Sequence, residues 1–169
     1  MAGFIDIACN FTHESFKRNL EEVINNAEHA GVEKFVLLCA SLTDLDPIKL
    51  IQNNAPDKYF VSAGIHPHHA TETVGINYNE LLSKLQSINP HAIGETGLDY
   101  FRNISPPDIQ KESFRMHIEI AKELSLPLYL HQRDAHDDFI RIIRENRKNF
   151  PKFVVHCFTG TQNELDDYL

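Results

Sequence analysis

Short apolar runs alternate with longer amphipathic stretches along this chain. Most of the short runs are apolar without strict alternation, which is typical of parallel strands buried on both faces of a sheet. The predicted strands cover residues 4–9, 34–39, 59–64, 91–94, 128–131 and 152–156. The pattern therefore predicts six strands separated by helices.

The stretches between these strands carry apolar residues at helical spacing. Phe16, Leu20, Val23, Ile24 and Ala27 lie on one face of a helix, and we expect Gly31 to end it. A longer helix is predicted to begin near residues 105–108 and to stop before Pro127. Its stripe is Phe114, His117, Ile118, Ala121 and Leu124, and further helices are predicted over residues 44–53, 77–87, 135–149 and 161–169.

The strand starts recur at about thirty residues, which is the size of a βαβ unit. Six such units in a row predict an α/β fold, either an open doubly wound sheet or most of a (β/α)8 barrel. A complete barrel usually takes about 250 residues, whereas this chain has 169. No Gly/Ser-rich linker or charge block divides it. We therefore expect one domain over residues 1–169 and, if it is a barrel, a C-terminally incomplete one.

Composition narrows the class of protein. No run of eighteen apolar residues occurs, so we expect no membrane-spanning segment. The N-terminus lacks the pattern of a secretory signal, and the three cysteines are odd in number and irregularly spaced. These features predict a cytoplasmic protein with reduced thiols. The formal net charge of −8 argues against a protein that grips nucleic acid through a broad basic face.

Three potential metal ligands follow apolar runs at matching places. Glu95, His131 and His156 stand where the fourth, fifth and sixth predicted strands end. The carboxyl ends of parallel strands share one face, where active sites assemble. Each residue alone has a structural interpretation: Glu95 as a helix cap or salt-bridged carboxylate, the histidines as core residues bonded to backbone. Three at matching positions favour a metal site.

Other polar residues gather near the same predicted face. His66 and His68 flank Pro67 after the third strand, and their loop has either a structural or a catalytic role. Arg133 and Arg102 lie just past the fifth and fourth strands and are candidates to clamp phosphate oxygens, with a surface role equally open for Arg102. We expect solvated or packed side chains at His13, His29, His91 and His117.

Five strings give the chain a resemblance to a known family. They are Asp6-Ile7 with Asn10, Gly64-Ile65-His66-Pro67-His68, Ala92-Ile93-Gly94-Glu95-Thr96-Gly97-Leu98-Asp99-Tyr100, His131-Gln132-Arg133-Asp134-Ala135-His136, and His156-Cys157-Phe158-Thr159-Gly160. In these strings the chain resembles the TatD family of metal-dependent deoxyribonucleases, which are amidohydrolase-like TIM barrels. The strings run in family order from the first predicted strand to near Leu169.

The resemblance implies a set of roles for these residues. Glu95, His131 and His156 would be ligands of a divalent metal, with magnesium favoured over manganese or zinc. His66 and His68 would lie in the substrate pocket. The implied activity is metal-dependent hydrolysis of DNA, and perhaps RNA, by a 3′-5′ exonuclease acting on single-stranded ends. The alternatives are a metal-dependent amide or ester hydrolase, such as an aminoacyl-tRNA deacylase, and a non-catalytic fragment of a TatD-type enzyme.

The chain departs from the family pattern in two places. Ala8 and Asn10 stand where many relatives have two histidine ligands, which argues against a full two-metal site. The acidic ligand that the family carries at its eighth strand has no counterpart among the 169 residues. We therefore expect the residues present to supply only part of the family's site. The oligomeric state is left open by the sequence.

Overall fold

In a computed structural model, which describes residues 3–148 and 152–169, six strands form one sheet in the order β1-β2-β3-β4-β5-β6. All five neighbouring pairs are parallel. The strands are β1 (Phe4–Cys9), β2 (Val32–Leu38), β3 (Tyr59–Ala63), β4 (Ala92–Asp99), β5 (Leu128–Arg133) and β6 (Phe153–Val155). The six-strand prediction is confirmed.

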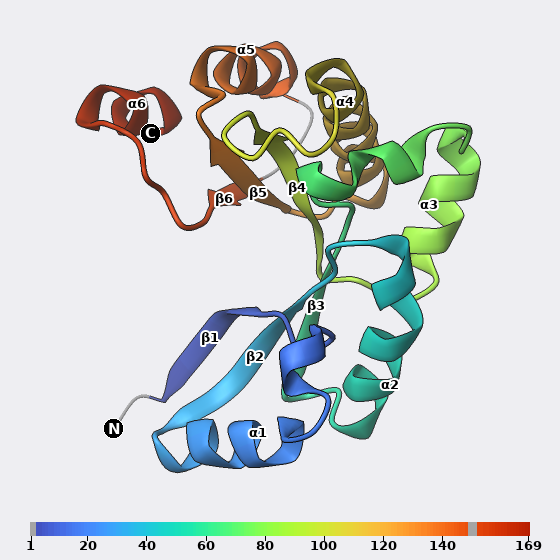
Figure 1. The fold of residues 1–169 in the computed structure, drawn as a ribbon, viewed down its shortest axis with the longest axis vertical. Coiled ribbons are helices and arrows are strands. Elements are labelled where there is room, and N and C mark those ends of the chain that lie inside the picture. The colour runs from blue at the N-terminus through green and yellow to red at the C-terminus, as the bar shows by residue number, and fades with distance from the viewer. Residues whose placement is uncertain (1–2, 149–151) are drawn as a thin grey trace.

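Helices follow the strands and cover one side of the sheet. They are α1 (Leu20–His29), α2 (Leu45–Asn54), α3 (Tyr78–Gln86), α4 (Pro107–Leu124), α5 (His136–Asn146) and α6 (Gln162–Tyr168), with the 3-10 turns η1 (Glu14–Phe16), η2 (Leu42–Asp44) and η3 (Pro67–Thr73). Figure 1 shows α1 to α5 around the outside of a curled sheet that is open between β1 and β6.

The strand order decides between the two predicted architectures. A doubly wound sheet reverses its strand order at a switch point and carries helices on both faces. Here the order never reverses, and the helices lie on the outside of the curl (Figure 1). The fold is therefore an incomplete (β/α)8 barrel of six units.

The core lies between the outer face of the sheet and the helices. Leu81 and Leu85 of α3, Phe114 and Ile118 of α4 and Phe139 of α5 are fully buried. The rings of Phe114 and Phe139 stack with their centroids 5.3 Å apart. This layer fixes α4 and α5 against β4 and β5, the strands that carry Glu95 and His131.

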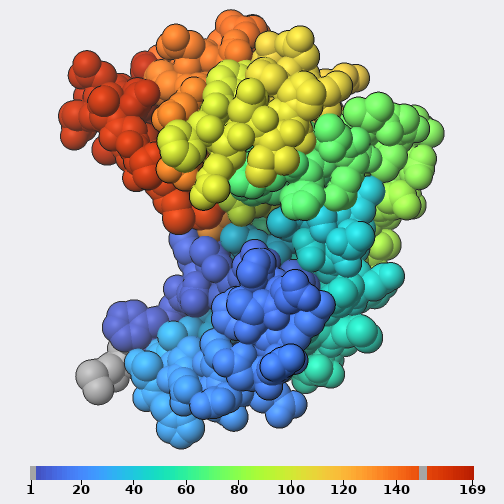
Figure 2. All heavy atoms as spheres, viewed as in Figure 1, coloured from blue at the N-terminus to red at the C-terminus, as the bar shows by residue number. Residues whose placement is uncertain are grey.

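The inner face of the curl is less covered than the sequence predicts. Ile5 and Ile7 of β1 are 58% and 47% exposed, and they line an apolar cavity of about 480 Å³ with residues of the other strands. Figure 2 shows the molecule indented on this side, between its N-terminal and C-terminal parts. Burial on both faces is thus a wrong prediction for β1, because β1 is an edge strand that pairs only with β2.

Among the described helices none is long and apolar enough to cross a bilayer.

The largest differences from the predicted element ends lie in β4, α1 and α5. β4 continues to Asp99 rather than stopping at residue 94, so Glu95 lies inside the strand. The first helix starts at Leu20, because Phe16 belongs to a separate 3-10 turn. α5 ends at Asn146, and residue 149, the last of that predicted helix, lies outside the described residues.

His117 links α4 to the loop after β3. Its side chain is fully buried, its Nε2 accepts a hydrogen bond from the Ile65 N–H at 3.0 Å, and its Nδ1 donates to the Ser113 carbonyl at 2.7 Å. The ring is thus neutral with its proton on Nδ1. Because Ile65 directly precedes His66, α4 fixes the start of the His66-Pro67-His68 loop.

We expect His117 to make stability depend on pH. Burial lowers the pKa of His117 from 6.5 to about 4, so below pH 6.5 the unfolded chain binds a proton that the folded chain does not. Stability is then lost as pH falls from about 6.5 towards 4. Between pH 7 and pH 5 this loss amounts to about 2 kcal/mol in the free energy of unfolding.

Urea unfolding of wild type and His117→Gln at pH 7 and pH 5 measures this effect. The variant should be less stable at pH 7 and should lose about 2 kcal/mol less than wild type on acidification. His29→Gln is the control, because His29 is exposed on α1. Equal pH slopes for wild type and His117→Gln would show that His117 is not the titrating group.

Candidate metal centre

One carboxylate oxygen lies at the centre of three imidazole rings. The Glu95 Oε1 atom is 3.1 Å from His131 Nδ1 and 3.6 Å from His66 Nε2, and it also contacts His156 Nε2. All four side chains are at least four-fifths buried. Glu95, His131 and His156 therefore converge, as their positions along the sequence predict.

Asp99 forms a second carboxylate beside the first. Its Oδ2 atom lies 2.7 Å from His68 Nε2 and 3.2 Å from His131 Nε2, and its Oδ1 accepts the Arg102 N–H at 2.8 Å. The Asp99 side chain is only 2% exposed. His131 is thus held between Glu95 and Asp99, one carboxylate at each ring nitrogen.

This arrangement suits a bound cation. A neutral imidazole has one N–H, so His131 can donate to only one of its two carboxylates. Its other nitrogen then points a lone pair at a carboxylate oxygen, which is repulsive unless a positive charge lies between them. The ligand atoms of His66, Glu95 and His131 all lie within 4.8 Å of one another. Imidazole nitrogens and a carboxylate oxygen are donors that divalent metals take.

Burial and neighbouring charges set the protonation of the cluster. Burial lowers the pKa of His66 to about 3, so its ring is neutral at physiological pH, and because its Nδ1 accepts the His68 N–H at 3.1 Å its proton lies on Nε2. Burial alone raises the pKa of Glu95, but hydrogen bonds from His131 and His156 outweigh it and bring that pKa below its ordinary value. For Asp99 too, burial is outweighed by hydrogen bonds, here from the Arg102 N–H and His68, so its pKa is lowered. Both carboxylates are therefore ionised.

Backbone and helix contacts hold the donors of the cluster in position. The His156 N–H donates to the Leu130 carbonyl at 3.1 Å, and the His66 N–H donates to the Ala40 carbonyl at 2.9 Å. Gln110 of α4 is fully buried. Its Oε1 accepts the Asp99 N–H at 2.8 Å, and its Nε2 donates to the Asp99 carbonyl. The site therefore rests on β4, β5, η3 and α4 together.

Arg133 and several other polar residues do not join the cluster. Arg133 lies against the Phe101 ring rather than near Glu95, with its Cζ 3.9 Å from the ring centroid. His69 pairs with Glu72 on η3 and His136 with Asp167 of α6. The Asp6 carboxylate accepts from the nearby Ala8 N–H on exposed β1. The structure thus brings together His66, His68, Glu95, Asp99, His131 and His156.

Two contributors are not evident from the sequence pattern. His117 lies in the apolar stripe of a predicted helix, where its spacing indicates packing. The sequence signal for a further role is that His117 is the one polar residue of that stripe. Gln110 carries no motif at all. The free cysteines lie outside the cluster, with Cys9 and Cys39 buried and Cys157 exposed.

Comparison with known sequences decides the family. The sequence model of the family described as TatD related DNase matches residues 5–169. The chain belongs to this family. Among TatD relatives, the 3′-5′ ssDNA/RNA exonuclease TatD of Erwinia billingiae is 37% identical over 161 residues, covering 95% of this chain and 62% of the relative. The protein of the same name from Pectobacterium atrosepticum is 36% identical over 164 residues, covering 97% and 63%.

Solved structures of TatD proteins share the fold. A TatD family hydrolase from Entamoeba histolytica superposes with a TM-score of 0.86 at 28% identity, covering 98% of this chain and 62% of that one. A TatD homologue from Escherichia coli K12 gives a TM-score of 0.81 at 24% identity, covering 98% and 64%. The chain therefore spans a little over three fifths of the length of these TatD relatives, and it carries six units of their barrel.

Proposed function

We propose that this protein is a metal-dependent hydrolase of phosphodiester bonds that removes nucleotides from the 3′ ends of single-stranded DNA or RNA. The observation that carries the proposal is the convergence of three imidazoles on the Glu95 carboxylate. Membership of the TatD-related DNase family supports it, as do the relatives named as 3′-5′ exonucleases. We propose that residues 1–169 act as one domain.

In this proposal Glu95, His131 and His156 hold one divalent cation. His66 lies beside these ligands with its protonated Nε2 directed at the Glu95 Oε1, 3.6 Å away, because its Nδ1 accepts the His68 N–H. Asp99 orients His131 by accepting from its Nε2, which leaves Nδ1 directed at the metal position. We propose magnesium as the ion in use, following the family resemblance, whereas imidazole donors favour zinc.

The remaining residues bind and orient the substrate. When bound, the cation supplies Lewis acidity and a water of lowered pKa. His68, held by Asp99, stands at the edge of the cluster and is placed to hydrogen-bond a phosphate oxygen or the attacking water. We propose that Arg133, which lies over the Phe101 ring, holds a neighbouring phosphate. The acidic net charge suits a short strand end entering this site better than a duplex lying across the surface.

We place this activity in the cytoplasm because the cysteines are free thiols and disulfides persist mainly in oxidising compartments. Burial raises the pKa of Cys39 to about 12. Its thiol is therefore protonated and unreactive.

Incubating the protein with 5′-labelled single-stranded DNA and RNA tests this function. We expect products that shorten from the 3′ end in the presence of Mg²⁺ or Mn²⁺ and no product in EDTA. A duplex with blunt ends is the matched control and should be cut more slowly. Faster metal-dependent turnover of an aminoacyl ester would favour the ester hydrolase instead, and absence of any turnover with metal bound would contradict catalysis by this chain.

A further inference from the structure

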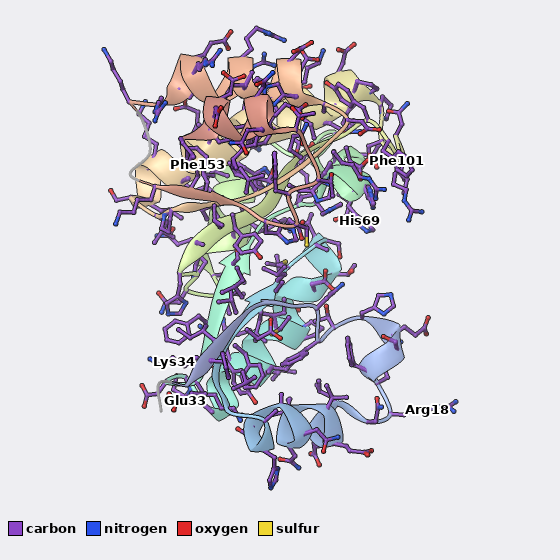
Figure 3. All side chains as sticks on the ribbon, turned by 90° about the vertical axis from the view of Figure 1, so that its left-hand side faces the viewer. Arg18, Glu33, Lys34, His69, Phe101 and Phe153 are labelled. Carbon is purple, nitrogen blue, oxygen red and sulfur yellow. The ribbon has the colours of Figure 1, made fainter. Side chains whose placement is uncertain are left out.

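An exposed aromatic ring stacked by an arginine lies at the rim of the metal centre. Phe101 is 55% exposed, and the Arg133 guanidinium lies over its ring with the Cζ 3.9 Å from the ring centroid. Figure 3 shows Phe101 on the same side of the molecule as His69 of η3. Phe101 therefore lies on the side of the molecule that carries η3, the turn that contains His68 of the cluster.

Chain geometry ties this pair closely to the cluster. Phe101 follows Asp99 by two residues and Arg133 follows His131 by two. Asp99 pairs with Arg133 in the register of β4 and β5, and the Tyr100 N–H donates to the Arg133 carbonyl at 2.9 Å. Since two residues of chain span at most about 7 Å, the Cα atoms of Phe101 and Asp99 lie no further apart than about one nucleotide's length.

Packing in the core and ion pairing do not account for the positions of Phe101 and Arg133. Phe101 does not belong to the hydrophobic core or to the residues packed against it. Within residues 3–148 and 152–169 no carboxylate forms an ion pair with Arg133, although acidic residues outnumber basic ones in the chain. An aromatic ring left in water and a cation left without a counter-ion both suit a ligand with an aromatic face and a negative charge.

The loop that carries Phe101 is firmly anchored. The Arg102 N–H donates to Asp99 Oδ1 at 2.8 Å. The buried Ser105 hydroxyl donates to the His68 carbonyl at 2.9 Å, and Gln110 Nε2 donates to the Ser105 carbonyl at 2.7 Å. These bonds join the loop to η3 and α4. The ring is therefore held in place before a ligand binds, which lowers the entropic cost of stacking.

We propose that Phe101 is the stacking platform for a nucleobase of the single strand, next to a phosphate held by Arg133. This inference rests on the proposed function and identifies a nucleobase site beside the metal centre. Aromatic stacking accepts any base because every base has a π face, and an arginine over the ring adds a cation–π contribution. The platform would thus bind the end of a single strand whatever its base sequence.

Binding of modified single strands tests the platform without turnover. The probe is a 5′-fluorescein oligodeoxynucleotide with phosphorothioate linkages at its 3′ end, either with normal bases or abasic at its last two positions. We expect Phe101→Ala to raise the Kd of the normal strand about tenfold and to leave that of the abasic strand unchanged. Phe101→Tyr should restore binding. Ile104→Ala, an exposed apolar residue of the same loop, should bind like wild type.

A base analogue reports the stacking itself. We expect 2-aminopurine at the 3′ end to be quenched by wild type and by Phe101→Tyr but not by Phe101→Ala. The platform is overturned if Phe101→Ala binds both strands like wild type, or if it weakens both strands equally. Failure of wild type to bind or cut any single strand would instead overturn the proposed function, and the platform with it.

Discussion

Replacing Glu95 with alanine is expected to remove divalent-cation binding from this protein. The Glu95 carboxylate is the one group that His66, His131 and His156 all approach. Its lowered pKa keeps it charged at physiological pH. Without it the histidines lose the negative charge that offsets the ion, and we expect affinity to fall by more than about 100-fold, beyond the usual effect of residues that only orient ligands.

Isothermal titration with Mn²⁺ measures this loss, and His156→Ala should show it as well. Glu112→Gln is the matched control, because it removes a carboxylate from an exposed position of α4. We expect the control to bind Mn²⁺ like wild type. Retained binding in both Glu95→Ala and His156→Ala would show that the ion, if any, sits elsewhere.

Gly97→Ala is expected to destabilise the protein strongly. Gly97 lies in β4 between Glu95 and Asp99 with φ at +140°, and a Cβ there would sit 2.0 Å from the His131 carbonyl oxygen. The neighbouring strand must then move away, or the backbone must change its conformation. Either costs about 3 kcal/mol or more in the free energy of unfolding.

Gly75→Ala separates the clash from the backbone preference. Gly75 also has a positive φ, +84°, but a Cβ there would meet no atom within 4 Å. Its replacement should cost only the left-handed strain of about 1 kcal/mol. Urea unfolding compares the two variants, and equal losses would mean that the close approach of β4 to His131 does not matter for stability.

Much of the fold was predictable because its strands are apolar and regularly spaced. The first strand has the predicted bounds, Phe4–Cys9, and the parallel order follows from the βαβ repeat. The extension of β4 was not predictable, because Gly94, Thr96 and Gly97 interrupt the apolar run. Pairing of Gly97 with His131 and of Leu98 with Gln132 holds these residues in the sheet, so tertiary contacts override local preference.

The site was predictable to the extent that each donor follows an apolar run, although Glu95 and His131 lie inside β4 and β5 rather than at their ends. Convergence of Glu95, His131 and His156 needs only parallel strands of similar length. The closeness of His66 to Glu95 could not be read from the chain, since it depends on the path of the loop after β3, which His117 fixes from α4. The sequence did not indicate a role for Phe101, because exposed aromatic residues in loops have no helical or strand periodicity that would mark them. Sequence thus located the ligands, whereas packing placed the residues around them.

The most direct test of the metal centre is anomalous diffraction at the manganese edge from crystals of this protein soaked in MnCl₂. We expect one strong peak within about 2.5 Å of the Glu95 carboxylate and of nitrogens from His131 and His156. A peak at surface carboxylates alone, with none beside Glu95, would contradict the metal centre described here.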